Sequence, residues 1–282
     1  MSTASTFTRR LTLADIPQPA KSVGAHLAAK LQHFGTDERT LTDELCDMLC
    51  IWLGMETKRR PASGPLPFTL TLSKTTASEE VKNGADLELI ISTPLGVKRC
   101  LIQAKVLDPT KGKLRCDSTA GWKKLRTQLV AARQDAKDLS FLLLYVPGKL
   151  LDGCRYDYGT YEQGMGLPAT GAVPAYYGAT LIPVDALLGP SGRWRNTKLK
   201  VVQNSAGQFK GGIPFWRALI ELLICRRSTW TPYSNSSHQE RPQAFRTLSI
   251  GASEINEAEW RELQALADQY LPSDFKADRD EA

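Results

Sequence analysis

The sequence predicts an α/β protein in which helices flank a mixed sheet. Between residues 37 and 147, segments with helical or strand-like spacing follow in the order helix, three strands, helix, strand. The last of these strands is apolar almost throughout, as expected for a strand that is covered on both faces. The helix before it forms a crossover connection, which favours a parallel pair of strands in the sheet.

The first helix is predicted for residues 37–54. Apolar residues recur at helical spacing from Leu41 onward. Asp37 or Thr40 can cap the N-terminus, and Gly54 can end the helix.

Three strands are predicted next, at residues 66–74, 85–92 and 99–107. The second and third are separated by the short connection "TPLG", so we expect them to form an antiparallel hairpin. A helix at residues 120–138 and the apolar strand at 140–147 complete the first half.

The second half of the chain is less regular. Residues 152–178 are rich in Gly and Tyr and are predicted to form a long ordered loop. A strand is predicted at 179–188, and helices at 214–227 and 256–271, with a polar loop at 233–245.

Neither a repeat nor a clear linker divides the chain into separate domains. The predicted elements at residues 37–147 define a core, and residues 1–36 before it are expected to form an N-terminal arm. Residues 148–282 are predicted to be an extension that packs on the core as part of the same domain.

The composition is that of a soluble globular protein, with 42% apolar and 23% charged residues in a chain of 282. No apolar run is long enough for a membrane span, and the N-terminus has no apolar signal-peptide region. Six scattered cysteines then indicate free thiols, and we expect a cytoplasmic protein. Since neither the histidines nor the cysteines have convincing ligand spacing, any metal should be held by oxygen.

Basic residues are mixed with tryptophan in two segments, 113–126 and 192–200. The net charge of +6 permits a polyanionic partner, and this mixture suits contact with phosphates and bases. A solvated basic surface is the alternative interpretation. The predicted nucleic-acid contacts are Lys123, Lys124, Arg126, Gln128, Arg193 and Arg195.

Charged and amide residues interrupt two of the predicted strands. Asp86 and Glu88 are two residues apart and share a face, as do Gln103 and Lys105. If the two strands pair as a hairpin, all four side chains can converge. Oxygen ligands beside a lysine suit phosphodiester cleavage assisted by Mg²⁺ or Mn²⁺, because the metal polarises the phosphate and the ammonium stabilises developing charge.

The order of these residues and elements resembles the PD-(D/E)XK, or restriction-endonuclease-like, nuclease superfamily. "GAD" at 84–86 corresponds to the PD element and "QAK" at 103–105 to the (D/E)XK element, with glutamine in place of the usual acid. The resemblance covers residues 37–147 and implies a restriction-endonuclease-like αβββαβ core. It also implies that Asp86 is the main metal ligand, assisted by Glu44 or Glu88. Gln103 would supply a further ligand oxygen or position water, and Lys105 would act on the transition state.

This resemblance implies a metal-dependent nuclease, with DNA as the favoured substrate, of the kind used in bacterial restriction or anti-phage defence. A helicase or sensor is the expected type of protein partner, and cutting both strands of a duplex would favour a homodimer. Two alternatives remain open. The chain could be a degenerate subunit that binds nucleic acid without cutting it, or an interaction protein that docks a partner.

Overall fold

The computed structural model describes residues 7–11, 17–56, 68–74, 85–93, 96–108, 114–115, 118–152, 155–157, 170–173, 175–195, 202–203, 208–209, 213–223 and 246–251. The helical elements are α1 (Pro17–Phe34), α2 (Glu38–Glu56), α3 (Thr119–Ala136), η3 (Lys137–Leu139), α4 (Gly148–Asp152), η4 (Ala175–Gly178), α6 (Val184–Leu187) and α7 (Phe215–Leu223). The strands are β1 (Phe7–Leu11), β2 (Phe68–Lys74), β3 (Leu87–Thr93), β4 (Gly96–Val106), β5 (Ser140–Tyr145), β6 (Arg155–Asp157), β7 (Thr170–Ala172), β8 (Ala179–Pro183), β9 (Val202–Gln203), β10 (Gln208–Phe209), β11 (Ile213–Pro214) and β12 (Arg246–Gly251).

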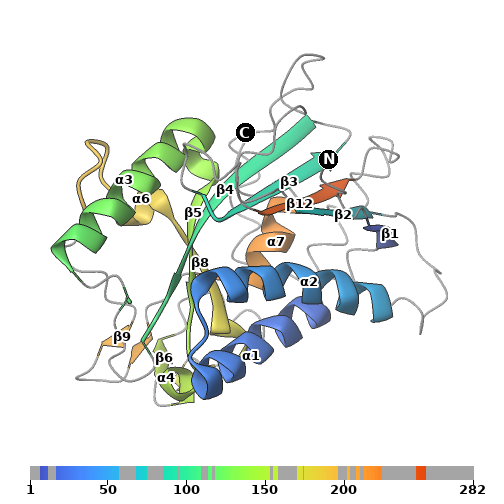
Figure 1. The fold of residues 1–282 in the computed structure, drawn as a ribbon, viewed down its shortest axis with the longest axis horizontal. Helices are drawn as coiled ribbons and strands as arrows, with labels where there is room; N and C mark the ends of the chain where they lie inside the picture. Colours follow the sequence, from blue (N-terminus) through green and yellow to red (C-terminus); the bar gives the residue numbers. More distant parts are fainter. Residues whose placement is uncertain are drawn as a thin grey trace.

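Eight of the described strands form one mixed sheet in the order β1-β2-β12-β3-β4-β5-β8-β11 (Figure 1). β3 and β4 are antiparallel, whereas β4 and β5 are parallel and connected through α3. The described residues also include a small sheet in the order β7-β6-β10-β9. The predicted α/β class, with a mixed sheet flanked by helices, is confirmed.

The two faces of the main sheet are covered by different helices. Buried side chains of α1, α2 and α7 pack with alternate residues of β3, β4 and β5, such as Leu89, Ile102 and Leu143. On the opposite face, Leu125 and Leu129 of α3 pack with residues of β5 and β8. Figure 1 shows α1 and α2 side by side, with α3 apart from them.

The element order predicted for residues 37–147 is present as α2, β2, β3, β4, α3 and β5. The hairpin is also present, since Thr93 pairs with Gly96. One arrangement was not predicted: β12 lies between β2 and β3, antiparallel to the first and parallel to the second. The restriction-endonuclease-like identity of this core remains a prediction.

The N-terminal segment differs from the predicted arm. It contributes β1, which pairs with β2, and α1, in which Val23, Leu27 and Leu31 are fully buried. These three residues are four apart, so they form one apolar helix face that the sheet and α2 cover. Burying this face makes α1 part of the core.

The extension after residue 148 adds β8, β11 and β12 to the main sheet. The loop predicted at 152–178 contains β6, β7 and η4. The loop predicted at 233–245 and the helix predicted at 256–271 lie outside the described residues. In the part of the chain that the structure describes, no helix is both long and apolar enough to cross a membrane.

Candidate active site

The candidate site lies where β4 extends beyond the start of β3. The last ladder pair is Leu87 with Ile102, and the amide of Asp86 donates to the carbonyl of Ile102 at 3.0 Å. β4 continues to Val106, and its other edge pairs with β5. The final residues of β4 therefore present backbone groups that β3 does not pair.

Three of the predicted site residues converge on Ala104 at this edge. The amide of Ala104 donates to Oδ2 of Asp86 at 2.8 Å, and Nζ of Lys105 donates to the carbonyl of Ala104 at 2.8 Å. Nε2 of Gln103 donates to the same Asp86 oxygen and, at 3.2 Å, to the Ala104 carbonyl. Because the N–H and C=O of one strand residue point to the same edge, Asp86 and Lys105 lie on the same side of β4.

A residue that was not predicted completes this cluster. Nζ of Lys105 donates to Oε1 of Glu38 at 2.6 Å. Glu38 is the first residue of α2, and Asp37 before it caps the helix by accepting from the Thr40 amide at 2.9 Å. That hydrogen bond is the main reason why the pKa of Asp37 is lowered. The cap fixes the start of α2 and with it the position of Glu38.

A hydrogen-bonded chain connects the first turn of α2 to the sheet. The hydroxyl of Tyr145 donates to Oγ1 of Thr42 at 2.9 Å, and Thr42 donates to the carbonyl of Glu38 at 2.8 Å. Burial raises the pKa of Tyr145 well above its usual value, and nearby negative charge, including that of Asp86 and Glu38, acts in the same direction. Tyr145 is therefore a neutral donor that holds α2 beside the site.

The amide oxygen of Gln103 is the unusual atom of the cluster. Gln103 is 1% exposed, and its Oε1 has no hydrogen-bond partner within the described part of the chain, although its Nε2 is bonded. An unpaired buried acceptor costs about 1–3 kcal/mol. Such an atom, on a side chain whose Nε2 contacts the carboxylate of Asp86, suits a hard cation that prefers oxygen ligands.

Two predicted metal ligands are bonded elsewhere. Glu44 accepts hydrogen bonds from Lys30 and, at 2.8 Å, from His26, both on α1. Burial alone raises the pKa of Glu44, but these two partners outweigh it and lower the pKa. Glu88 is fully buried and forms an ion pair with Arg99. Among the described residues, no group of three or more His, Cys, Asp or Glu side chains is arranged to hold a metal.

Glu38 could have been found from the sequence. The buried face of α2 includes Leu41, Thr42 and Leu45, and Glu38 precedes the first two of these by three and four residues. Glu38 therefore lies on the same helix face, one turn earlier. Glu44 lies six residues further on, which is about 9 Å along the helix axis.

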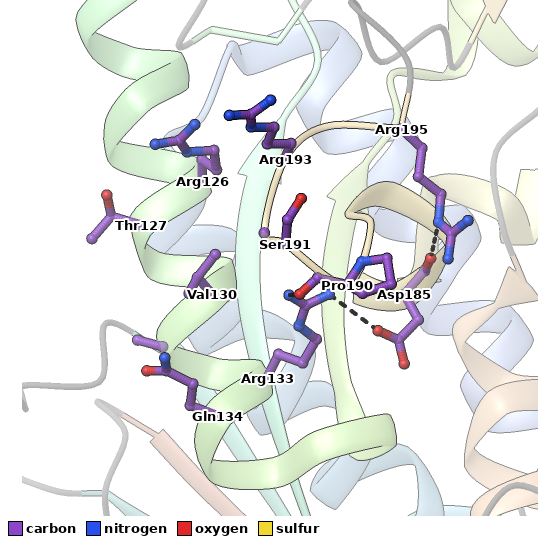
Figure 2. Close-up of a pocket in the computed structure, with 12 residues that line it drawn as sticks. Arg126, Thr127, Val130, Arg133, Gln134, Asp185, Pro190, Ser191, Arg193 and Arg195 are labelled. Carbon is purple, nitrogen blue, oxygen red and sulfur yellow. Dashed lines mark hydrogen bonds and ion pairs between the residues drawn. The ribbon is translucent and has the colours of Figure 1, made fainter.

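The two basic segments also meet in space. Arg126 of α3, together with Arg193 and Arg195, lines an open groove between α3 and residues 189–195 (Figure 2). Trp122 and Trp194 pack edge to face with their ring centroids 5.4 Å apart. Of the other predicted contacts, Lys123 and Lys124 are exposed and Gln128 is half-buried on α3.

Comparisons of the chain with protein-family models, with curated proteins and with solved structures found no match. The chemistry of the described residues therefore carries the functional argument.

Proposed function

We propose that the protein is a metal-dependent nuclease that hydrolyses phosphodiester bonds, with DNA as the favoured substrate. The proposal depends on one observation above all: Asp86, Gln103 and Lys105 converge on the edge of β4 that extends beyond β3. A carboxylate, an unpaired amide oxygen and a nearly buried ammonium lie within one hydrogen-bond network there. This set of groups matches the requirements of phosphodiester cleavage.

Asp86, Gln103 and Glu38 are the residues that would hold Mg²⁺ or Mn²⁺. The fit rests on the carboxylates of Asp86 and Glu38, which are connected by hydrogen bonds through Ala104 and Lys105. It rests also on Oε1 of Gln103, which has no hydrogen-bond partner among the described residues. A bound divalent cation would polarise the phosphate and lower the pKa of a coordinated water. Two carboxylates and one neutral amide are a weakly charged set, so we expect weak metal binding.

The protein groups would act on charge and position. Nε2 of Gln103 and the Ala104 amide hold the Asp86 carboxylate in one orientation. The ammonium of Lys105 would stabilise negative charge that develops on the phosphate oxygens. To do so it would exchange its contact with Glu38, which is 38% exposed, for a contact with the substrate.

The resemblance of residues 37–147 to the PD-(D/E)XK nuclease superfamily supports a wider proposal about fold and biological role. We propose a restriction-endonuclease-like core and a role in restriction or anti-phage defence. A helicase or sensor partner and a homodimer are parts of this proposal, and cleavage of both strands of a duplex would test the dimer.

The test is cleavage of plasmid DNA, single-stranded DNA and RNA with Mg²⁺, with Mn²⁺ and with EDTA. We expect cleavage that EDTA abolishes, and a loss of at least about 100-fold, or roughly 2.7 kcal/mol, in Asp86→Asn and Lys105→Met. Binding of Mn²⁺, followed by electron paramagnetic resonance, should weaken in Asp86→Asn. Full cleavage by both folded variants would disprove the proposed site.

A matched pair of variants identifies the acid of α2. Glu38→Gln and Glu44→Gln make the same chemical change six residues apart on one helix. We expect Glu38→Gln to lose cleavage and Mn²⁺ affinity, because Glu38 contacts Lys105. Glu44→Gln should keep both, since the Glu44 carboxylate binds Lys30 and His26. The opposite result would restore Glu44 to the site.

Two observations favour a second candidate function. Lys105 is already paired with Glu38, and the described residues offer no set of three acidic, His or Cys ligands. A protein that binds nucleic acid through this fold without cutting it would have such features. It would bind DNA at low salt, and neither Mg²⁺ nor Mn²⁺ would produce cleavage.

A further inference from the structure

We propose that the groove between α3 and residues 189–195 binds the phosphodiester backbone of a nucleic acid strand, with Arg126 and Arg193 contacting the phosphates. The choice of a nucleic acid as the anion rests on the proposed function. The binding itself requires neither metal nor cleavage. The basic residues of the groove have two roles: Arg133 and Arg195 hold the turn at residues 189–195 in place, whereas Arg126 and Arg193 bind the ligand.

The groove is large enough for a polymer backbone and is strongly basic. Its volume is about 1220 Å³, and its walls come from α3, α6 and residues 190–195. Four arginines line it, at positions 126, 133, 193 and 195, against one carboxylate, that of Asp185. The positive charge of the groove therefore exceeds its negative charge.

Arg133 builds the groove. Its Nη1 donates to Oδ1 of Asp185 at 3.4 Å (Figure 2). Nη1 also donates to the carbonyl of Gly189 at 2.9 Å, and Nη2 donates to the carbonyl of Pro190 at 3.4 Å. These bonds fix the turn against α3. Since Arg133 is engaged with several acceptors, it has little capacity left for a ligand.

Two further contacts hold the turn in place. Nε of Arg195 donates to the carbonyl of Asp185 at 2.7 Å. Gly192 has a φ of +72°, and a Cβ at this position would lie 3.1 Å from Cγ2 of Val130. Only glycine combines that backbone conformation with such a close approach, so the wall of the groove is preorganised.

Arg126 and Arg193 are different. Both are exposed, and neither guanidinium has an ion-pair or hydrogen-bond partner among the described residues. Figure 2 shows them at the same end of the groove, one from α3 and one from the turn. A planar guanidinium matches the geometry of phosphate, and an anion between two of them would relieve their mutual repulsion.

The position of each residue on α3 shows how the site continues. At about 100° per residue, Lys123 lies within about 60° of Arg126 and extends the groove face by one turn. Lys124 and Gln128 lie about 160° from Arg126, on the opposite flank of the helix. The six contacts predicted from the sequence therefore divide between two surfaces, and only one of them is the groove.

The groove should read the backbone rather than the bases. Its two neighbouring tryptophans, Trp122 and Trp194, are partly buried and pack against each other and against the core. They are therefore occupied by packing, and the cationic groups left to contact a ligand are the guanidiniums of Arg126 and Arg193. Phosphate contacts carry no direct sequence information, so we expect binding without sequence preference.

The test is fluorescence anisotropy of labelled single-stranded and duplex DNA over a range of salt concentrations, in EDTA so that cleavage cannot contribute. We expect Arg126→Gln and Arg193→Gln each to weaken binding about tenfold. Each should also reduce the slope of log Kd against log salt by about one, because one phosphate contact is lost. Lys149→Gln removes an exposed charge on α4 and is the control; it should leave Kd nearly unchanged.

Three outcomes would overturn the inference. One is a salt slope that does not change in either arginine variant. Another is a loss in Lys124→Gln, on the opposite flank, as large as that in Arg126→Gln. The third is equal competition by poly-glutamate, which would show a general affinity for acidic polymers. DNA binding in EDTA without cleavage in Mg²⁺ would reject the proposed nuclease activity while supporting the groove as a binding site. Cleavage in Mg²⁺ with no DNA binding by the groove in EDTA would reject only the groove.

Discussion

Glu44 illustrates how partners decide the role of a single carboxylate. Its side chain is 20% exposed and is bonded to Lys30 and His26 of the neighbouring helix. Burial raises its pKa, but the hydrogen bonds and positive charge of these partners exceed that effect. The pKa of Glu44 is therefore lower in the folded protein than its ordinary value of about 4.5.

This shift predicts how stability depends on pH. Since the folded-state pKa is depressed, the contribution of Glu44 should be complete above about pH 4.5 and should be lost as the pH falls through the folded-state pKa. We expect Glu44→Gln to lower the free energy of unfolding by about 1 kcal/mol at neutral pH, and by less in acid. Urea unfolding of both proteins across this range measures the difference.

The control for this prediction is Asp152→Asn, which removes an exposed carboxylate from α4. It measures the general effect of losing one negative charge. If the difference in the free energy of unfolding between wild type and Glu44→Gln stayed constant or grew below pH 4.5, the contacts with Lys30 and His26 would not be its cause.

At the residue scale, the sequence predicted those site members that share a strand hairpin. Asp86, Gln103 and Lys105 were identified because strand periodicity and a short connection place them together. Whether the Glu38 or the Glu44 side chain faces the sheet depends on the packing of α2 against both α1 and β4. The spacing of the buried residues of α2 indicates that Glu38 lies on the face toward the sheet. The PD-(D/E)XK motif alone does not distinguish Glu38 from Glu44.

At the element scale, the docking of α1 depends on backbone contact with η4. A Cβ added to Gly24 would lie 2.4 Å from the carbonyl oxygen of Tyr176. A Cβ added to Gly178 would lie 2.2 Å from the carbonyl oxygen of Gly24. Such distances require the backbone to move, because a carbonyl group of a packed element cannot rotate away.

Gly24→Ala should therefore destabilise the protein, although alanine favours an isolated helix. We expect a loss of about 1–3 kcal/mol in the free energy of unfolding, measured by thermal or urea denaturation. Gly148→Ala is the matched control. Its Cβ would lie 3.7 Å from the nearest atom, the carbonyl oxygen of Ala28, which is an ordinary contact distance. Equal stability of the two variants would show that α1 does not need this close approach.

The elements of residues 37–147 were predictable because each depends on a local pattern. α1 was not predicted, although Val23, Leu27 and Leu31 have the spacing of a helix face. The prolines at positions 17 and 19 obscured the pattern, but the first turn of a helix tolerates proline since its amides have no intrahelical acceptor.

At the scale of the whole molecule, β12 joins two parts of the main sheet. In register it pairs Leu248 with Leu72 of β2 on one side and with Leu89 of β3 on the other. A strand from near the end of the chain thus connects β1 and β2 to the rest of the sheet. Periodicity could not predict this pairing, because the choice of a distant parallel partner depends on the topology of the whole sheet.

A proline in β12 should show how far the sheet depends on this strand. Since β12 has a neighbour on each side, the amide of Leu248 points toward a strand in either orientation, and Leu248→Pro removes that donor. We expect a loss of about 3 kcal/mol or more, a large part of the roughly 5–15 kcal/mol that stabilises a typical domain.

Hydrogen exchange should show lower protection in β2 and β3. Arg9→Pro in β1, at the end of the strand order, should cost less. If Leu248→Pro left the exchange of β2 and β3 unchanged, the two strands would not need β12 between them. The β3–β4 hairpin alone would then hold Asp86, the site residue immediately before β3.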